Sequence, residues 1–452
     1  MQATVQTLRG FDDPLLAPRR QSRILFLAHR FPCPPDKGDR IRAYHFLRRL
    51  AERHRVWCVA FADEPVSAAA LAHMREMCVD AVALPVGRWR ARAGALRSFL
   101  SGGTATQGAL RSELMMRLVQ SWAREHAIDT VVAYSSGMAP FALAVPNVRR
   151  VLDFCDVDSQ KWAELAETAR GPRRWIWSSE ARRLRAAELH WAEQADCTLI
   201  ITPRERELIA RYLEPHKLAV VGNGVNVPAD VSPPAESLGP VAGFVGAMDY
   251  APSVDGMCWF VRQVWPQVRR LAPRASLLIV GRRPARAVQA LAGRDGVCVT
   301  GGVSDVGAFL RRIRVGVAPL RVARGLPNKV LEMMAFGRPV VATSGVSECI
   351  ECGPAAGVFV ADDAGQFAQT VASLLTDDER CARAARAAHR RALARFDWAS
   401  RALLFERMVI GPQRVVRTAP RAVELPLRAV RRGRGVRPPA DAPGPELVTA
   451  GA

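Results

Sequence analysis

The sequence lacks a long hydrophobic run. No stretch of about 18 consecutive apolar residues, the length that a membrane-spanning helix needs, occurs in the 452-residue chain. The segment from Met1 to Gln21 carries charges and prolines where a secretion signal has an apolar core. We therefore expect a cytoplasmic protein. Its 49% of hydrophobic and 24% of charged residues are typical of a globular chain.

Paired cysteines and lysine are also scarce. Among ten cysteines, only Cys349 and Cys352 are closely spaced, so we expect reduced, buried side chains and no disulfide framework. The only lysines are Lys37, Lys161, Lys217 and Lys329. The net charge of +21 therefore comes almost wholly from arginine. A basic surface attracts polyanions, either nucleic acid or an anionic membrane face, and charge alone does not choose between them.

Two series of strand-length apolar runs alternate with helical segments, which predicts parallel α/β layers. The first series comprises residues 23–28, 56–61, 81–84, 130–134, 150–154, 197–201 and 218–221. The second comprises residues 241–246, 276–280, 297–300, 315–318, 339–342 and 358–360. Several runs are apolar throughout, as expected of strands that are covered on both faces.

We expect two Rossmann-like, doubly wound parallel-sheet domains, at 23–227 and 241–376, that face one another across a cleft. A flexible N-terminus (1–22) precedes them, and a linker rich in proline, serine and alanine (228–240) joins them. Helices follow at 377–410. The last segment (411–452) has eight arginines after Gly411 and little periodicity, so we expect a disordered basic tail. Open sheets of this kind bind ligands beyond the carboxyl ends of their strands.

The most informative motif runs from Gly325 to Val341. Pro327 suits the first turn of a helix, and Gly337 suits its end. Asn328 and Glu332 share a face of this helix, with Lys329 beside them. A helix N-terminus that carries a lysine suits a diphosphate, and a carboxylate one turn later can accept both hydroxyls of a ribose. The same pattern also fits an ordinary amphipathic helix with a solvated Lys–Glu pair.

This motif resembles the second half of the signature of the retaining GT-B glycosyltransferases of family 4, a pair of glutamates eight apart followed by Ala-x-Gly-x-Pro-Val. The residues that match are Glu332, Ala335, Gly337, Pro339 and Val340. The resemblance implies that Glu332 binds the donor ribose. The first glutamate of the signature is replaced by Arg324, which puts the family's contacts to the donor sugar in question.

Other segments follow in the order of the same family, over residues 23 to 409. The loop from Pro32 to Arg40 places Gly38 where the family has a glycine near the donor phosphates. Asn223-Gly-Val-Asn226 resembles the family's hinge. Gly246 lies at the first strand-to-loop junction of the nucleotide domain. Arg282 or Arg283 matches the family's basic residue at the diphosphate.

Four segments are similar in sequence to those of a narrower group: Asp36–Arg42, Asp153–Trp162, Met248–Asp255 and Asn328–Glu332. These are the sugar transferases of PEP-CTERM/exosortase systems, which accompany exopolysaccharide synthesis. This resemblance implies a role in exopolysaccharide biosynthesis.

Many members of the family have a histidine after the fifth strand of the N-terminal domain, where this chain has Asp156 and Asp158. An aspartate there can orient the acceptor hydroxyl or take its proton. Three alternatives stay open: an N-cap for the next helix, simple exposure to solvent, and a DxD metal site. His29 has no partner visible in the sequence, so we expect it to be structural.

The resemblance implies transfer from a nucleotide-sugar donor to a saccharide or lipid-linked saccharide, with no cofactor and no metal. A basic amphipathic helix for an anionic membrane surface is predicted by Trp89, Leu96, Phe99 and Leu100 with Arg88, Arg90, Arg92 and Arg97. A helix packed on its own domain fits equally. Two rival functions remain. A sugar-nucleotide epimerase has the same fold, and a basic protein can bind polyanions without catalysis. Nucleic acid is not expected as a partner, because aromatic residues do not alternate with the arginines.

Overall fold

The computed structural model describes residues 21–36, 38–228, 239–321 and 326–411. Most of the expected linker, the expected tail beyond Gly411, the first 20 residues and Arg324 lie outside these ranges. Among the described residues, no helix is both long enough and apolar enough to cross a bilayer.

The N-terminal sheet has seven parallel strands in the order β3-β2-β1-β4-β5-β6-β7. Their bounds are β1 (Arg23–Ala28), β2 (Arg55–Ala62), β3 (Asp80–Pro85), β4 (Thr130–Tyr134), β5 (Arg149–Cys155), β6 (Cys197–Ile200) and β7 (Leu218–Val220). The helices of this half are α1 (Gly38–Ala51), α2 (Ala68–Met77), α3 (Arg88–Leu100), α4 (Ala105–Leu110), α5 (Glu113–Glu125), α6 (Ala139–Leu143), α7 (Asp158–Thr168), α8 (Pro172–Gln194) and α9 (Pro203–Ala210).

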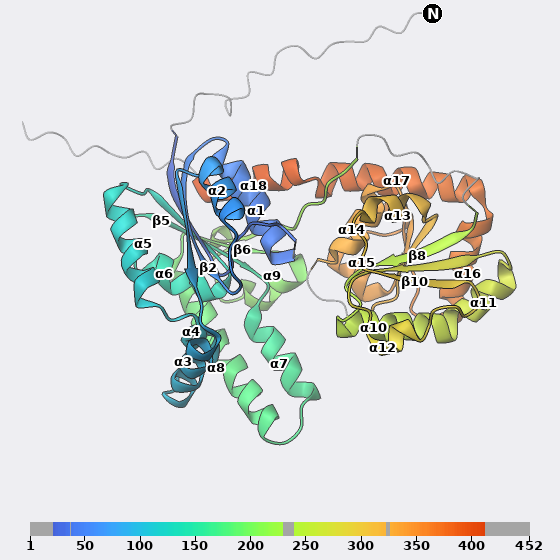
Figure 1. The fold of residues 1–452 in the computed structure, drawn as a ribbon, viewed down its shortest axis with the longest axis horizontal. Helices are drawn as coiled ribbons and strands as arrows, with labels where there is room; N and C mark the ends of the chain where they lie inside the picture. The colour runs from blue at the N-terminus through green and yellow to red at the C-terminus, as the bar shows by residue number, and fades with distance from the viewer. Residues whose placement is uncertain (1–20, 37, 229–238, 322–325, 412–452) are drawn as a thin grey trace, which may run out of the picture. The chain divides into compact units, whose positions relative to one another are not determined.

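The C-terminal sheet has six parallel strands in the order β10-β9-β8-β11-β12-β13. They are β8 (Val241–Val245), β9 (Ser276–Val280), β10 (Val297–Gly301), β11 (Val315–Ala318), β12 (Val340–Ala342) and β13 (Val358–Val360). Its helices are α10 (Ala251–Trp259), α11 (Trp265–Leu271), α12 (Arg286–Gln289), α13 (Val306–Arg312), α14 (Asn328–Ala335), α15 (Ser344–Ile350) and α16 (Ala364–Thr376). Helices α10 and α12 lie on one side of this sheet, and α13 on the other (Figure 1).

Each sheet is buried on both faces, which explains the continuously apolar strands. Along β1, Leu25 and Leu27 point into one hydrophobic cluster, whereas Ile24 and Phe26 point into another. The C-terminal sheet lies within one large cluster of its own. A strand lies in each of the thirteen apolar runs, and the sequence prediction of two Rossmann-like parallel-sheet domains is confirmed.

The final run of helix is broken in two, α17 (Asp378–Phe396) and α18 (Trp398–Ile410). Asp397 separates them because its carboxylate caps α18, accepting from the backbone N–H of Ala399 at 2.9 Å. Helix α17 packs against α14, and α18 packs against α1, with Phe405 stacked on Phe46 at 4.1 Å between ring centroids. Helix α18 thus brings the chain back to the N-terminal domain.

Candidate functional site

Helix α14 carries the predicted donor-binding residues. Pro327 occupies the N-cap, and the helix runs from Asn328 to Ala335. Phe336 is its C-cap, and the predicted terminal glycine follows: Gly337 has a φ of 65°, in the left-handed region, and its N–H donates to the carbonyl of Met334 at 2.9 Å. Val330, Leu331 and the methionines that follow are buried, which leaves Asn328, Lys329 and Glu332 only partly covered.

Lys329 is held in a fixed position. Its Nζ donates to the Ser253 hydroxyl at 3.1 Å and lies 5.1 Å from the centroid of the Phe244 ring. A Cβ atom on Gly246 would come within 3.4 Å of this Nζ, so glycine keeps the space around the ammonium open. Burial lowers the pKa of Lys329 to about 8, although the carboxylate of Glu332 acts in the opposite direction. A desolvated cation of this kind attracts an anion strongly.

Glu332 lies one turn further along α14 and is half-buried. Burial raises the pKa of its carboxyl, and Lys329 opposes that change. No hydrogen bond to the Glu332 carboxyl is formed by any residue that the structure describes. A half-buried carboxyl with open acceptors suits a ligand that brings its own hydroxyl donors.

The two candidate arginines after β9 differ in their partners. Arg283 has a positive φ of 50° and pairs with Asp249 at 2.9 Å. Arg282 extends to the loop before α1, where its guanidinium donates to the carbonyl of Asp36 at 3.4 Å. Arg282 is therefore the arginine that points toward the Gly38 loop, whereas the charge of Arg283 is already balanced.

A cavity of about 420 Å³ brings four predicted residues together, Gly38, Asp156, Asp158 and Asn328. The other side chains around it include His29, Arg30, Asp39, Arg42, Tyr134, Lys161 and Asn223. A Cβ atom on Gly38 would stand 3.9 Å from the side-chain amide of Asn328, so this glycine lies directly against α14. Burial raises the pKa of Tyr250, and the carboxylate of Asp156 raises it further. The centroid of the Tyr250 ring lies 5.9 Å from the Lys329 Nζ, so Tyr250 is close to both groups.

The aspartate loop is shaped by a bulge at the end of β5. The pairing with β6 shifts between Asp153 and Cys155, and Cys155 has a positive φ of 62°. A bulge turns the following side chains to a new direction, and here Asp156 lines the cavity. Asp158 accepts a hydrogen bond from the Ser136 hydroxyl at 2.6 Å. Desolvation by the surrounding protein raises the pKa of Asp156, and the charge of Asp158 raises it further.

A buried hydrogen-bonded chain links this loop to α14, and the sequence interpretation did not find it. Arg42 is 1% exposed and binds both carboxylate oxygens of Asp153, at 2.9 and 3.0 Å. It also donates to the side chain of Asn223 at 3.1 Å, and Asn223 donates to Asn328 at 3.0 Å. Arg42, Asp153 and Asn223 stand in segments that carried the resemblance, but nothing in the sequence paired them.

His29 lies at a position that the sequence did not suggest. It lines the cavity, and its Nε2 lies 3.5 Å from the carboxylate of Asp39. Arg30 also binds Asp39, at 2.6 Å. Although burial acts in the opposite direction, His29 and Arg30 hold the pKa of Asp39 well below its usual range. The expectation that His29 is structural is not tested, but its position makes it part of the cavity wall.

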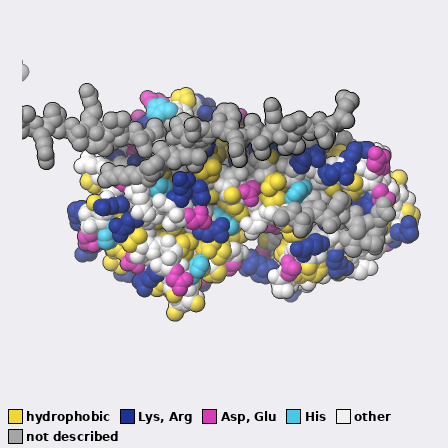
Figure 2. Space-filling model, turned by 90° about the horizontal axis from the view of Figure 1, so that it is seen from above, with side chains coloured by type: hydrophobic (Ala, Val, Ile, Leu, Met, Phe, Trp, Pro, Cys, Tyr) yellow, Lys and Arg dark blue, Asp and Glu magenta, His cyan; other side chains and the backbone are white. Residues whose placement is uncertain are grey.

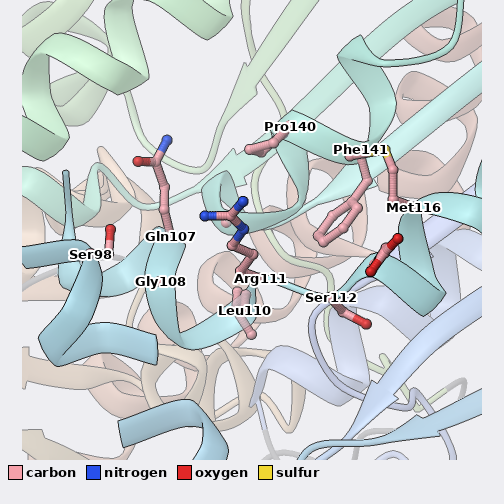
Figure 3. A pocket seen from close by; sticks show the side chains of 11 residues that line it. Ser98, Gln107, Gly108, Leu110, Arg111, Ser112, Met116, Pro140 and Phe141 are labelled. Atoms are coloured by element: carbon pink, nitrogen blue, oxygen red, sulfur yellow. The ribbon is translucent and has the colours of Figure 1, made fainter. Parts of the chain in front are cut away.

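A second cavity, of about 490 Å³, lies in the N-terminal domain among α3, α4, α5 and α6 (Figure 3). Arg111, Gln107 and Phe141 line it, and no predicted site residue does. Gly137 lines this cavity, whereas Ser135 lines the first one. A single short turn of chain therefore separates the two.

In the described part of the chain, no group of three or more His, Cys, Asp or Glu side chains is arranged to hold a metal ion. Activity without a metal stays a prediction.

Lysine and arginine side chains are scattered among acidic and apolar ones on the face in Figure 2.

Comparison with known families places the C-terminal half. Residues 239–377 match the family described as glycosyl transferases group 1. The matched residues are those of the C-terminal domain, from β8 to α16. With this family in the domain that carries Lys329 and Glu332, the enzyme class of the chain is glycosyltransferase. No curated protein sequence matches the chain.

Solved structures match over nearly the whole described chain, at low identity. Sucrose-phosphate synthase (tll1590) from Thermosynechococcus elongatus has a TM-score of 0.63 at 15% identity, covering 86% of this chain and 98% of its own. Anabaena Alr3699/HepE, solved with UDP and glucose, has a TM-score of 0.58 at 14% identity, covering 85% and 98%. WaaG, a glycosyltransferase of lipopolysaccharide biosynthesis, has a TM-score of 0.57 at 15% identity, covering 86% and 100%. These similarities identify the fold as GT-B.

Proposed function

We propose that this glycosyltransferase binds the nucleotide sugar at α14 and transfers the sugar to a saccharide or lipid-linked saccharide. The observation that carries the proposal is that Lys329 and Glu332 lie one turn apart on the same face of α14. Lys329 is desolvated and fixed by Ser253, and Glu332 has open acceptors one turn away. A cation at a helix N-terminus suits the diphosphate, and the carboxyl suits the ribose.

In this proposal the diphosphate lies between the N-terminus of α14, Lys329 and Arg282, next to Gly246. These groups stabilise the charge that develops on the leaving phosphate. The acceptor approaches through the cavity lined by Gly38, and Asp156 or Asp158 orients its hydroxyl and takes its proton. UDP is the nucleotide to test first, because Alr3699/HepE and TarM were each solved with UDP.

Three finer features of the proposal rest on the sequence resemblance alone. They are retention at the anomeric carbon, a place in exopolysaccharide biosynthesis, and membership of the PEP-CTERM-associated group. NMR of the product settles the first, because an α-linked donor gives an α-linked product only with retention. An inverted product would remove that part of the proposal.

The surface of α3 supports the proposed attachment to an anionic membrane. No residue of this helix is buried, and Trp89 and Leu100 are 79% and 76% exposed. Phe99 packs edge-on against Trp175 of α8, which is 62% exposed, so the apolar surface continues onto a second helix. The arginines beside these side chains are Arg88, Arg90, Arg92, Arg97, Arg173 and Arg174. Aromatic and basic side chains on one surface suit the lipid headgroup region.

Nucleotide binding is the direct test of the donor site. Calorimetric titration with UDP, GDP and TDP should give one nucleotide that binds to the wild type and binds weakly to Lys329→Met. Product analysis with the matching nucleotide sugar then separates a transferase from an epimerase, because only the transferase needs an acceptor. Equal binding of all three nucleotides by both proteins would overturn the donor site.

Vesicle flotation tests the membrane surface. Replacing Trp89 and Trp175 by serine should reduce flotation with anionic vesicles, and raising the salt concentration should release the wild type. Leu393→Ser is a matched control, because Leu393 is 54% exposed on α17. Equal flotation of all three proteins would remove α3 and α8 from the membrane surface.

A further inference from the structure

Glu205, in the first turn of α9, departs from the role that its local sequence suggests. Thr202-Pro-Arg-Glu205 has the spacing of a capping box, and the Thr202 hydroxyl does accept from the backbone N–H of Glu205 at 3.2 Å. In a capping box the glutamate turns back to the N–H of the N-cap residue. Here Oε1 of Glu205 instead accepts from the backbone N–H of Val157, in the aspartate loop, at 3.4 Å.

The second oxygen of the same carboxyl is buried next to Asp156. Oε2 of Glu205 is closed off from solvent, and no N–H or O–H of the described residues serves it. The carboxyl groups of Glu205 and Asp156 lie close enough to share a hydrogen bond if one of them carries a proton. Two carboxyl groups form such a bond only if one of them carries a proton, because two carboxylates have no donor and repel each other.

The surroundings decide which carboxyl carries the proton. Asp156 faces the cavity, where Arg42 and Lys161 favour its ionised form. The carboxylates of Asp156 and Asp158 both raise the pKa of Glu205. The charged groups that shift the pKa of Glu205 most include no cation. Arg185 of α8 donates to the carbonyl of Leu208.

Three further ionisable side chains complete the environment of Glu205. Helix α15 contributes Glu348 and Cys349, and burial raises the pKa of Cys349. The charge of Arg204, the neighbour of Glu205 in the chain, opposes this rise in the pKa of Cys349. Because the carboxylates of Asp156 and Asp158 disfavour a charge on Glu205, and because Oε2 has no other partner among the described residues, we place the proton on Oε2 of Glu205.

We propose that Glu205 is a positioning residue whose protonated carboxyl donates to Asp156 and holds it as a carboxylate facing the acceptor. The proposal rests on the proposed function, in which Asp156 lies at the reacting centre. Burial, and then Asp156, raise the pKa of Glu205 to about 9, in agreement with a proton held at neutral pH. When Glu205 ionises, the hydrogen bond becomes a repulsion and Asp156 loses its orientation.

Stability as a function of pH tests the shared proton without any activity. Between its ordinary pKa of 4.5 and about 9, Glu205 keeps a proton in the folded chain that the unfolded chain has released. Wild-type stability therefore falls as pH rises through this window. Glu205→Gln keeps a donor and does not titrate, so its melting temperature should rise relative to that of the wild type as pH rises, by roughly 2–4 °C for each kcal/mol that the wild type loses.

Glu207→Gln is the matched control, because Glu207 lies on the same helix and is exposed. Its melting temperature should stay parallel to that of the wild type at every pH. If Glu205→Gln also stays parallel to the wild type, Glu205 is an ordinary carboxylate and the proposal is overturned, whatever the enzyme transfers.

Turnover then tests the positioning of Asp156. Glu205→Leu should lower kcat on the order of 10- to 100-fold with little change in the donor KM, because the reacting group is misplaced and the donor site is untouched. Glu205→Gln should recover most of that loss and should remove the fall in kcat above about pH 9. Unchanged kcat in Glu205→Leu would overturn the positioning role. Failure of the wild type to transfer sugar from any donor, with the stability result intact, would instead overturn the proposed function.

Discussion

The two halves of the candidate site are built in different ways. In the C-terminal domain, Asn328, Lys329 and Glu332 lie within five consecutive positions of one helix. In the N-terminal domain, Arg42, Asp153 and Asn223 come from segments more than 50 residues apart and meet only in the folded chain. The proposed donor half is therefore encoded locally, and the proposed acceptor half depends on long-range packing. The family match covers the first and not the second.

This difference predicts how each half responds to substitution. A residue of the donor half acts on the ligand, and its loss should change binding more than folding. A residue of the buried chain supports the fold itself, so its loss should change stability first. Four experiments sharpen or break that contrast.

The largest effect is expected from Arg42→Met. The variant leaves the fully buried carboxylate of Asp153 without its cation, which typically costs about 3–5 kcal/mol. Chemical denaturation should show this loss in the free energy of unfolding. Arg48→Met is the control, because Arg48 pairs with Glu52 at the surface of the same helix, where a pair contributes less than about 1 kcal/mol. Adding Asp153→Leu to Arg42→Met should restore part of the loss, and no recovery would contradict the orphaned-charge explanation.

The fold was predictable from the sequence because strand burial leaves a local trace. Runs such as 276–280 and 315–318 coincide with β9 and β11, since both faces of each strand are covered and the whole run is apolar. Helix α14 was predictable for a similar reason. Its proline, its apolar stripe and its terminal glycine all lie within eleven residues.

The remainder depended on contacts between distant residues. Nothing near Arg42 indicates that it pairs with Asp153, and nothing near Glu205 indicates that it turns away from its own helix. The break at Asp397 follows the same rule. A single aspartate in a helical pattern is common, and here it ends one helix and caps the next because α18 packs on the N-terminal sheet.

The second effect in size is expected from Glu332→Gln. Losing a charge-assisted hydrogen bond to the ribose should cost about 1.5–3 kcal/mol, or roughly 10- to 150-fold in the Kd for the donor nucleotide. The melting temperature should not fall, because burial already disfavours the charge on this carboxyl. Calorimetric titration measures the change, with the exposed Glu379→Gln of α17 as control. An unchanged Kd would remove Glu332 from the site.

A third, smaller effect concerns pH. The ammonium of Lys329 is lost as pH rises through about 8, so the Kd for UDP should increase by up to about tenfold per pH unit above that value. Lys329→Met should bind weakly with no such dependence. The lowered pKa of Lys329 also makes the free energy of unfolding increase as pH rises from about 8 to 10.5. In this range the unfolded chain binds more protons than the folded one. A flat Kd across this range in the wild type would mean that the ammonium does not meet the phosphates.

The smallest expected effect is that of chelation, which should leave sugar transfer unchanged. In the donor half, Lys329 and Arg282 offer the positive charge that a metal supplies in other transferases. In the acceptor half, both aspartates of the Asp156-Val-Asp158 pair already have partners. Ser136 donates to Asp158, and the carboxyl of Glu205 lies next to Asp156, so a cation would have to displace the first and compete with the second. Transfer measured in excess EDTA, with and without added Mg²⁺ or Mn²⁺, decides the matter. If EDTA abolishes transfer and a divalent ion restores it, the acceptor half holds the missing charge, and Asp156 and Asp158 become the first candidates for its ligands.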